Sequence, residues 1–289
     1  MRTIESQPTM PLRSLGVPDG DESPTFTRRE TLLTMYGVLM VMLLASLDQT
    51  IVGTAMPHII ATLNGFDEYT WVTTAYLLTS TVMVPIYGKL SDIFGRKPIF
   101  MIGVTLFLLG SALSGASQTM LQLILFRGFQ GIGAGALMPI AMTVVGDLFS
   151  PRERGKWQGV TGAVFGLSSI LGPTLGGWIS DNFTWRWVFY VNLPIGIAAM
   201  LVLAFLMPRL RAKNRNATID YIGCALIALG TVPMLLGFTW AGTTYPWLSW
   251  QVLGLILGGA VVLGLLVFYE IWLERGHGQP IIEPTLFKN

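Results

Sequence analysis

The chain has 289 residues, of which 52% are hydrophobic and only 12% are charged, about half the charged share of an average soluble domain. Of its 18 basic and 16 acidic residues, nine lie in residues 1–30, so 25 remain for the other 259. Such a composition excludes a soluble enzyme and a disordered chain, and the single cysteine, Cys224, excludes a disulfide scaffold. An integral membrane protein is expected, with the lipid bilayer as partner and no nucleic acid.

Eight apolar stretches follow one another, each near the roughly 20 residues that cross a bilayer. Helices are expected for all of them, because lipid leaves backbone groups no other partners and the alternating pattern of barrel strands is absent. The stretches cover residues 32–57, 71–88, 99–117, 120–146, 158–179, 187–207, 221–241 and 250–272. The predicted organisation is a polar cytosolic tail over 1–30, a six-helix bundle over 31–207, a cytosolic linker over 208–220, two further transmembrane helices over 221–273 and a cytosolic tail over 274–289.

The basic residues predict the orientation. With the amino terminus in the cytosol, 16 of the 18 fall in the tails or in the loops on the inner side. Only Arg186 lies in an outer loop, and Arg127 lies within the fourth span. By the positive-inside rule, both termini are expected in the cytosol of a protein of the plasma membrane.

An acidic residue, Asp48, lies in the first span, in SLDQTIVGTAMP, and Arg127 and Gln130 lie in the fourth, in LFRGFQGIGAGALMP. At 1.5 Å per residue, Asp48 and Arg127 reach a similar depth in the outer half of the membrane. An ion there costs about 2.5–3.5 kcal/mol, which favours a partner, a polar cavity or a function. One interpretation is a static ion pair. The other is a titratable carboxylate beside a fixed cation on the wall of an open polar cavity.

The loop after the second span, GKLSDIFGRK, holds a fixed order of glycine and charge, namely Gly88, Asp92, Gly95, Arg96 and Lys97. Asp92 is placed to cap the third helix. Arg96 is placed to pair with Asp92 or with Asp147, at the inner end of the fourth span. The alternative is that these cations only anchor the inner face.

The fifth span contains GPTLGG, in which Pro173 is expected to kink the helix while Gly172, Gly176 and Gly177 give it a smooth face. The two histidines, His58 and His277, are expected to be isolated, the first near a membrane interface and the second in the tail. No metal site, cofactor or catalytic triad is indicated.

An internal repeat relates the two halves of the first six spans. GKLSDIFGRKPIF at 88–100 resembles GWISDNFTWRWVF at 177–189, a shift of 89 residues in which Lys97 matches Arg186. Because three helices separate the copies, one copy is inside and the other outside. This predicts a three-plus-three inverted repeat, a mark of transporter folds.

Together these motifs resemble the major facilitator superfamily. The loop, the fourth-span motif and GPTLGG resemble its signatures, and LDQTIVGTAMP resembles the first-helix motif of its fourteen-helix drug:proton antiporters. WRWVFYVNLPIG is similar to the sixth helix of that family. Two positions depart from the pattern: Ile93 stands where a basic residue is common, and Gly53 where asparagine is common.

The resemblance implies an all-α fold whose amino-terminal six-helix bundle is followed by two inserted helices, with a carboxyl-terminal bundle missing. It implies that Asp48, assisted by Arg127 and Gln130, couples protons to small lipophilic, often cationic substrates. It implies further that Asp92, Arg96 and Asp147 form a cytosolic charge relay and that Gly172, Pro173, Gly176 and Gly177 shape the exchange helix. The expected function is multidrug export by proton antiport and no enzymatic activity. The alternatives are export of a single metabolite or siderophore, or a truncated subunit that does not transport.

Overall fold

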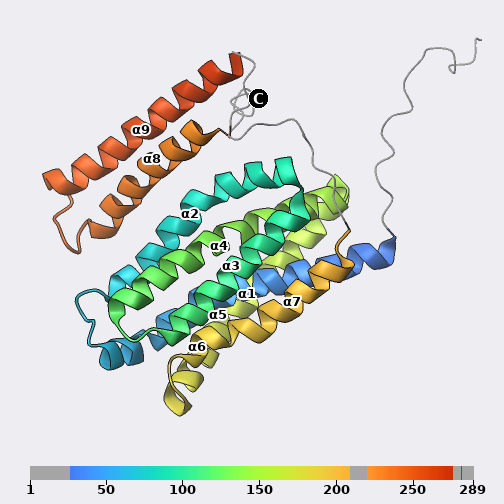
Figure 1. The fold of residues 1–289 in the computed structure, drawn as a ribbon, viewed down its shortest axis with the longest axis horizontal. Coiled ribbons are helices and arrows are strands. Elements are labelled where there is room, and N and C mark those ends of the chain that lie inside the picture. Colours follow the sequence, from blue (N-terminus) through green and yellow to red (C-terminus); the bar gives the residue numbers. More distant parts are fainter. Residues whose placement is uncertain (1–26, 209–219, 276–280, 282–289) are drawn as a thin grey trace, which may run out of the picture.

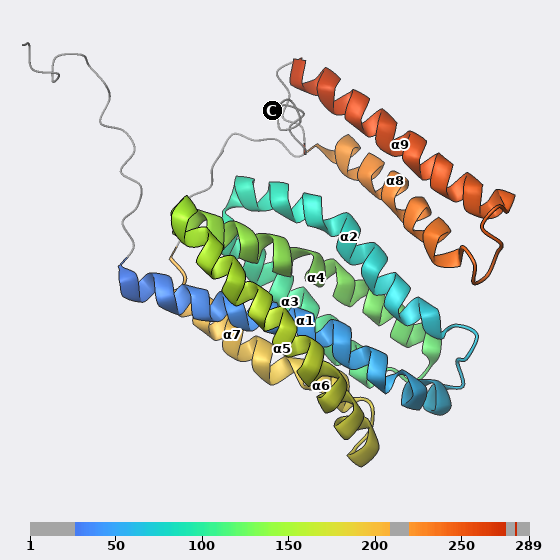
Figure 2. The same cartoon turned by 180° about the vertical axis from the view of Figure 1, so that it is seen from behind.

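The computed structural model describes residues 27–208, 220–275 and 281. This part of the chain is helical apart from one isolated bridge between Ala241 and Tyr245. The helices are α1 (Arg28–Leu63), α2 (Tyr69–Phe94), α3 (Arg96–Ala116), α4 (Met120–Leu148), α5 (Pro151–Asn182), α6 (Trp187–Tyr190), α7 (Asn192–Leu206), α8 (Tyr221–Trp240) and α9 (Trp250–Arg275). Figures 1 and 2 show α1–α7 as one bundle, with the α8–α9 hairpin beside α2. The all-α fold with two additional helices is therefore confirmed.

The predicted spans coincide with helices, and polar caps extend several helices beyond the apolar stretches. At the start of α1, the Thr27 side chain accepts from the Glu30 amide while Glu30 accepts from the Thr27 amide, a capping box. Ser150 and Glu153 form the same box at the start of α5. Glu30, expected in the amino-terminal tail, and Glu153, expected in the loop before the fifth span, thus belong to helices. Most of the predicted tails and of the linker 208–220, including His277, lies outside the described residues.

Seven helical segments of the described chain are long and apolar enough to cross a membrane, one fewer than expected. They are α1, α3, α4, α5, the joined α6–α7 segment, α8 and α9. The exception, α2, is rich in threonine and serine, with Thr73, Thr74, Thr79, Ser80 and Thr81 in its middle. It nevertheless has 26 residues, about 39 Å of helix, and packs along α4.

The inverted repeat is visible in the packing. A shift of 89 residues carries α1, α2 and α3 onto α4, α5 and α6–α7. In the structure α4 packs against α2 and α3, and α1 packs correspondingly against α5 and α7. Each helix that packs against α4 is thus matched, through the repeat, by a helix that packs against α1. This correspondence confirms the three-plus-three arrangement.

Two basic residues show the same symmetry at opposite ends of the bundle. Lys97 donates 2.7 Å hydrogen bonds from Nζ to the carbonyls of Ala204 and Met207, at the end of α7. Its repeat partner Arg186 donates a 2.8 Å bond from Nη2 to the carbonyl of Ser117, just after α3. Each cation thus satisfies carbonyls at the negative end of a helix dipole.

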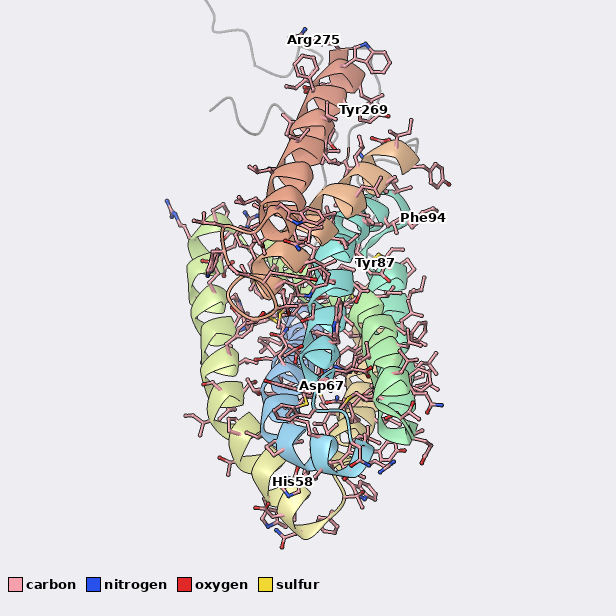
Figure 3. All side chains as sticks on the ribbon, turned by 90° about the vertical axis from the view of Figure 1, so that its left-hand side faces the viewer. His58, Asp67, Tyr87, Phe94, Tyr269 and Arg275 are labelled. Carbon is pink, nitrogen blue, oxygen red and sulfur yellow. The ribbon has the colours of Figure 1, made fainter. Side chains whose placement is uncertain are left out.

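The two ends of the bundle are distinguished in Figure 3, where His58 and Asp67 lie at one end and Phe94 and Arg275 toward the other. These are called here the His58 end and the Arg96 end. The buried apolar residues form two clusters, one toward each end. The first includes Val41, Phe100, Val104, Leu137 and Leu203, and the second includes Ile51, Ile59, Leu123, Val188 and Phe189. Along α1, α4 and α7, the polar residues of the candidate site lie between them.

The α8–α9 hairpin has its own internal contacts and touches the bundle mainly through α2. Asp220 caps α8 by accepting a 2.8 Å bond from the Gly223 amide, and it also accepts a 3.1 Å bond from the Tyr269 hydroxyl of α9. At the other end, the rings of Trp71 and Trp240 meet edge to face. The hairpin is thus an addition to the six-helix bundle rather than part of its core.

Candidate functional site

An ion pair lies inside the bundle, between α1 and α4. Arg127 donates a 2.8 Å hydrogen bond from Nη1 to Oδ2 of Asp48. The exposed fraction of the side chain is 2% for Arg127 and 0% for Asp48. The two residues therefore lie at one level of the bundle, as helical rise predicts, and Arg127 is among the largest fully buried side chains described.

Gln130 lies one turn along α4 from Arg127 and joins both partners. Its Nε2 donates to Oδ1 of Asp48 at 2.9 Å, and its Oε1 accepts from Arg127 at 2.8 Å. The spacing of three residues places Arg127 and Gln130 on one face of the helix. The predicted grouping of Asp48, Arg127 and Gln130 is thus present as one hydrogen-bonded set.

Two further residues complete this set. Asn192, the first residue of α7, donates from Nδ2 to Oδ1 of Asp48 at 2.8 Å and to Oγ of Ser111 at 3.0 Å. Ser111 of α3 donates in turn to the carbonyl of Phe189 at 2.9 Å. These five residues, Asp48, Arg127, Gln130, Asn192 and Ser111, are called the Asp48 cluster. It draws together α1, α3, α4 and α7.

Aromatic rings cover the guanidinium. The Cζ atom of Arg127 lies 4.0 Å from the ring centre of Tyr76 in α2 and 5.8 Å from that of Phe189 in α6. A guanidinium over an aromatic face gains a favourable interaction that grows when water is excluded. Both rings are buried, so they hold the cation in place and close it off from solvent.

The structure differs here from the expected open cavity wall, because every member of the Asp48 cluster is buried. Asp48, Gln130, Asn192 and Ser111 are all fully buried. The polar residue that follows Asp48, Gln49, is exposed instead, as is Gly53 one turn further along α1. The helices close around the cluster, so none of its side chains is open to solvent.

Small residues allow the helices to approach closely around the cluster. Gly110 of α3 packs directly on the backbone of Gln130, where a Cβ atom would meet Cα at 2.5 Å. Gly133 packs in the same way on the backbone of α3 around Phe107. Glycine at such contacts lets helix backbones approach in a membrane. Gly110 and Gly133 therefore set the distance between α3 and α4 at the level of the polar residues.

The fifth-span motif divides into two groups. Gly172 and Gly176 of α5 are buried against α1, where Cβ atoms would collide with the hydroxyls of Thr50 and Thr54. Thr50 also donates a 3.2 Å bond to the Ser168 carbonyl across this interface. Pro173 and Gly177 lie away from α1, Pro173 being exposed and Gly177 having open space beside it. The kink expected at Pro173 does not interrupt α5, which is helical from Pro151 to Asn182.

The charges of the loop motif meet at the Arg96 end. Arg96 pairs with Asp92 at 2.6 Å and with Asp147 of α4 at 3.1 Å, and it also donates to the Ser91 hydroxyl at 2.6 Å. Both predicted partners are thus correct. Asp92 does not cap α3, since it lies within α2 and points its carboxylate to Arg96. Gly95 has φ 94° and ψ 156°, a conformation that favours glycine and turns the chain sharply between the helices.

The other motif residues take different positions around this charge cluster. Lys97 faces α7, as described above, and Gly88 has open space beside it. Arg96 is mostly buried, with 10% of its side chain exposed, while the side chains of Asp92 and Asp147 are 41% and 38% exposed. The alternative interpretation, that the cations of this loop only anchor the inner face of the protein, does not explain why Arg96 is buried between two carboxylates.

A counterpart of this cluster lies at the His58 end. The repeat relates Asp92 to Asp181 and Asp147 to His58, and His58 Nε2 lies 3.6 Å from Oδ1 of Asp181. The prediction that His58 is isolated is therefore wrong. The position equivalent to Arg96 is Trp185, so the His58 end has a direct pair where the Arg96 end has an arginine between two carboxylates.

A groove of about 420 Å³ lies outside the six-helix bundle, between α2, α4 and α8. It is lined mainly by apolar side chains, among them Trp71, Val82, Ile124, Ile132 and Val232. None of the Asp48 cluster lines it. The groove therefore belongs to the surface where the added hairpin meets the bundle.

Sequence patterns missed Asn192, Ser111 and Tyr76. Serine and tyrosine are common in apolar helices, so neither gave a signal. Asn192 did give one, since it stands in the sixth span immediately before LPIG, and a membrane-embedded amide needs hydrogen-bonding partners.

Comparison with known proteins gives the family of this fold. Residues 38–220 match the model of the Major Facilitator Superfamily. The chain is 45% identical over 265 residues to the multidrug transporter protein MdtP of Bacillus subtilis, covering 91% of this chain and 47% of that protein. It is 44% identical over 269 residues to multidrug resistance protein 3 of the same organism, covering 93% and 51%. The chain spans about half the length of the curated relatives it matches.

Solved structures agree on the fold. The human organic anion transporter MFSD10 matches with a TM-score of 0.55 at 18% identity, covering 84% of this chain and 61% of that one. The xylose transporter XylE from E. coli matches with a TM-score of 0.53 at 13% identity, covering 86% and 58%. These proteins move solutes across membranes and are not enzymes. The chain belongs to the major facilitator superfamily of membrane transporters.

Proposed function

We propose that this chain is the amino-terminal part of a proton-coupled multidrug exporter, related to the fourteen-helix drug:proton antiporters. The observation that carries the proposal is Asp48, an acid buried in the membrane-spanning layer with hydrogen-bond donors on three sides. A carboxylate at this depth is costly unless it has a function or a partner. The names of the two Bacillus relatives support multidrug export.

The proposed cycle alternates between two occupants of one site. An ionised Asp48 pairs with Arg127, as in the structure, and a proton taken up from outside neutralises the acid and weakens that pair. A lipophilic cation then competes with the proton for the carboxylate, so export of one is coupled to entry of the other. Arg127 stays charged throughout, because a guanidinium does not lose its proton in proteins.

A second bundle is proposed to supply the opposite wall of the transport path, since alternating access requires two bundles that rock about a midplane site. The surface of α5 supports this. Gly155, Gly159, Gly162 and Gly166 lie on one helical face and have open space beside them, and small residues on such a face favour helix packing. Both termini and the Arg96 end are assigned to the cytosol of the plasma membrane, following the basic residues.

The experiment compares the chain alone with the chain joined to the carboxyl-terminal part of the MdtP relative. Both are expressed in cells that lack their own multidrug pumps, and ethidium efflux is followed by fluorescence. Efflux is expected only from the joined protein, and Asp48→Asn is expected to abolish it at unchanged expression. Efflux by the Asp48→Asn variant at the unmodified rate would overturn the proposal.

Export of a single biosynthetic product is the second candidate. It is favoured by a relative described as a transporter of the acurin A biosynthesis cluster of Aspergillus aculeatus, 37% identical over 284 residues. Competition separates the two functions. Unrelated lipophilic cations compete with ethidium for a multidrug exporter and fail to compete for a carrier of one metabolite.

A further inference from the structure

The amide of Asn192 connects the acid to the junction between α6 and α7. One Nδ2 hydrogen serves Oδ1 of Asp48 and the other serves Oγ of Ser111. The Ser111 hydroxyl donates onward to the carbonyl of Phe189. A continuous series of hydrogen bonds therefore runs from the carboxylate to the backbone of α6, and its first member is donated to Asp48, as an ionised carboxylate requires.

Asn192 also holds an acceptor that nothing uses. Its Oδ1 atom is buried and has no hydrogen-bond partner in the described part of the chain. An unmet buried acceptor is costly, so this atom is expected to accept a hydrogen bond in another state. Of the two side-chain amide oxygens in the Asp48 cluster, Oε1 of Gln130 already accepts from Arg127.

Protonation of Asp48 creates the donor that fits this acceptor. An ionised carboxylate only accepts hydrogen bonds, whereas the acid form carries one O–H donor. Arg127 offers no acceptor atom. A rotation of the Asn192 side-chain amide exchanges Nδ2 and Oδ1, so that Oδ1 accepts from the acid.

The hydrogen-bond ladder of the helix is already interrupted at this point, although Val191 keeps helical dihedral angles. Pro194 has no amide hydrogen, so the carbonyl of Tyr190, four residues before it, has no donor from that position. The two helices accordingly separate between Tyr190 and Asn192. A side chain on the first residue of α7 is thus attached where the helix is least continuous.

We infer that Asn192 is a positioning residue that senses the protonation of Asp48 by rotation of its amide and passes the change through Ser111 to the α6–α7 junction. The inference rests on the proposed function in one respect, the uptake of a proton by Asp48. The charged or titratable groups facing Asp48 are Arg127 from α4 and Tyr76 from α2. Within the membrane-spanning stretches, α3, α5 and α7 carry only neutral residues.

The test is the infrared difference spectrum of the purified chain in lipid nanodiscs, recorded between an acidic and an alkaline buffer. Two bands are expected to change together: a carboxyl band that is lost in Asp48→Asn, and a side-chain amide band that is lost in Asn192→Leu. Labelling the asparagines of the unmodified chain with carbon-13 must shift the same amide band. This identifies the band as an asparagine band even if the Asn192→Leu variant does not fold.

Matched variants of α3 test the link to α6. Ser111→Ala removes the bond to Phe189 and is expected to alter the amide band. Ser114→Ala removes a buried hydroxyl one turn away that has no partner in the described chain, and is expected to leave the band unchanged. A carboxyl band without any asparagine band would overturn this inference and leave the proposed function standing. Absence of the Asp48 carboxyl band would overturn the proposed function and this inference with it.

Discussion

Arg127 Nη1 and Asp48 Oδ2 lie 2.8 Å apart, although the two residues are 79 positions apart in the chain, and the pair is sealed from solvent. Three donors converge on the carboxylate, while the rings of Tyr76 and Phe189 cover the guanidinium. A polar layer of this kind between two apolar clusters depends for its stability on the hydrogen bonds that its members make to one another.

Removal of the cation should therefore destabilise the chain strongly. Arg127→Met leaves Asp48 buried without its counter-charge, at a cost of about 3–5 kcal/mol. Adding Asp48→Leu to that variant should restore much of the loss, because no unpaired charge then remains. Reversible unfolding in mixed detergent micelles measures both values. Arg152→Met, which changes an exposed arginine of α5, is the control, and an equal effect of both arginine variants would contradict this account.

The close contact between α1 and α5 predicts unequal effects of glycine substitutions on one helix. Gly172→Ala and Gly176→Ala place a methyl group against Thr50 and Thr54, which should lower stability by about 1–3 kcal/mol. Gly166→Ala enters open space on the same helix and should stabilise it by up to about 1 kcal/mol. Thermal unfolding in detergent compares the three. Equal melting temperatures would show that α5 does not pack on α1 as described.

Much of this arrangement is predictable from the sequence. The depth of Asp48 and Arg127 follows from helical rise alone, and the two residues do meet. The partners of Arg96 follow from the loop motif and the end of the fourth span. The repeat is predictable from one short matching window. Three membrane-crossing helices separate the two copies, so the copies must lie on opposite sides of the membrane.

Other features depend on packing that sequence patterns do not contain. Burial of the Asp48 cluster depends on how tightly glycine contacts such as that of Gly110 with Gln130 close the bundle. His58 finds Asp181 only because α1 and α5 end together. The break in helical hydrogen bonding between α6 and α7 is consistent with Pro194, which lacks an amide hydrogen. The apolar stretch around Pro194 is continuous, however, and by itself predicts a single helix.

The charge cluster at the Arg96 end should hold α2, α3 and α4 together. Arg96→Met leaves Asp92 and Asp147 without their shared partner, but both carboxylates are partly exposed, so the loss should be modest, about 1–2 kcal/mol. Hydrogen exchange should increase in residues 91–97 and at the end of α4. Lys156→Met, on the exposed start of α5, should leave hydrogen exchange in residues 91–97 unchanged. Unaltered exchange in Arg96→Met would contradict the view that this charge cluster holds the three helices together.

The two symmetric caps give a paired prediction. Lys97→Met should increase backbone exchange at the end of α7, because the carbonyls of Ala204 and Met207 lose their donor. Arg186→Met should do the same at the end of α3 through Ser117. Each variant should affect only its own end of the bundle. A uniform increase in both variants would indicate general loosening and not loss of a local cap.

The central claim is that Asp48 exchanges a proton for a lipophilic cation. Proton release into weakly buffered solution, on addition of tetraphenylphosphonium to the purified protein joined to the carboxyl-terminal part of its relative, tests this claim most directly. The unmodified protein and the control Asp181→Asn, which changes an exposed carboxylate, should release protons, and Asp48→Asn should release none. Equal release by Asp48→Asn would place the coupling group elsewhere and contradict the account.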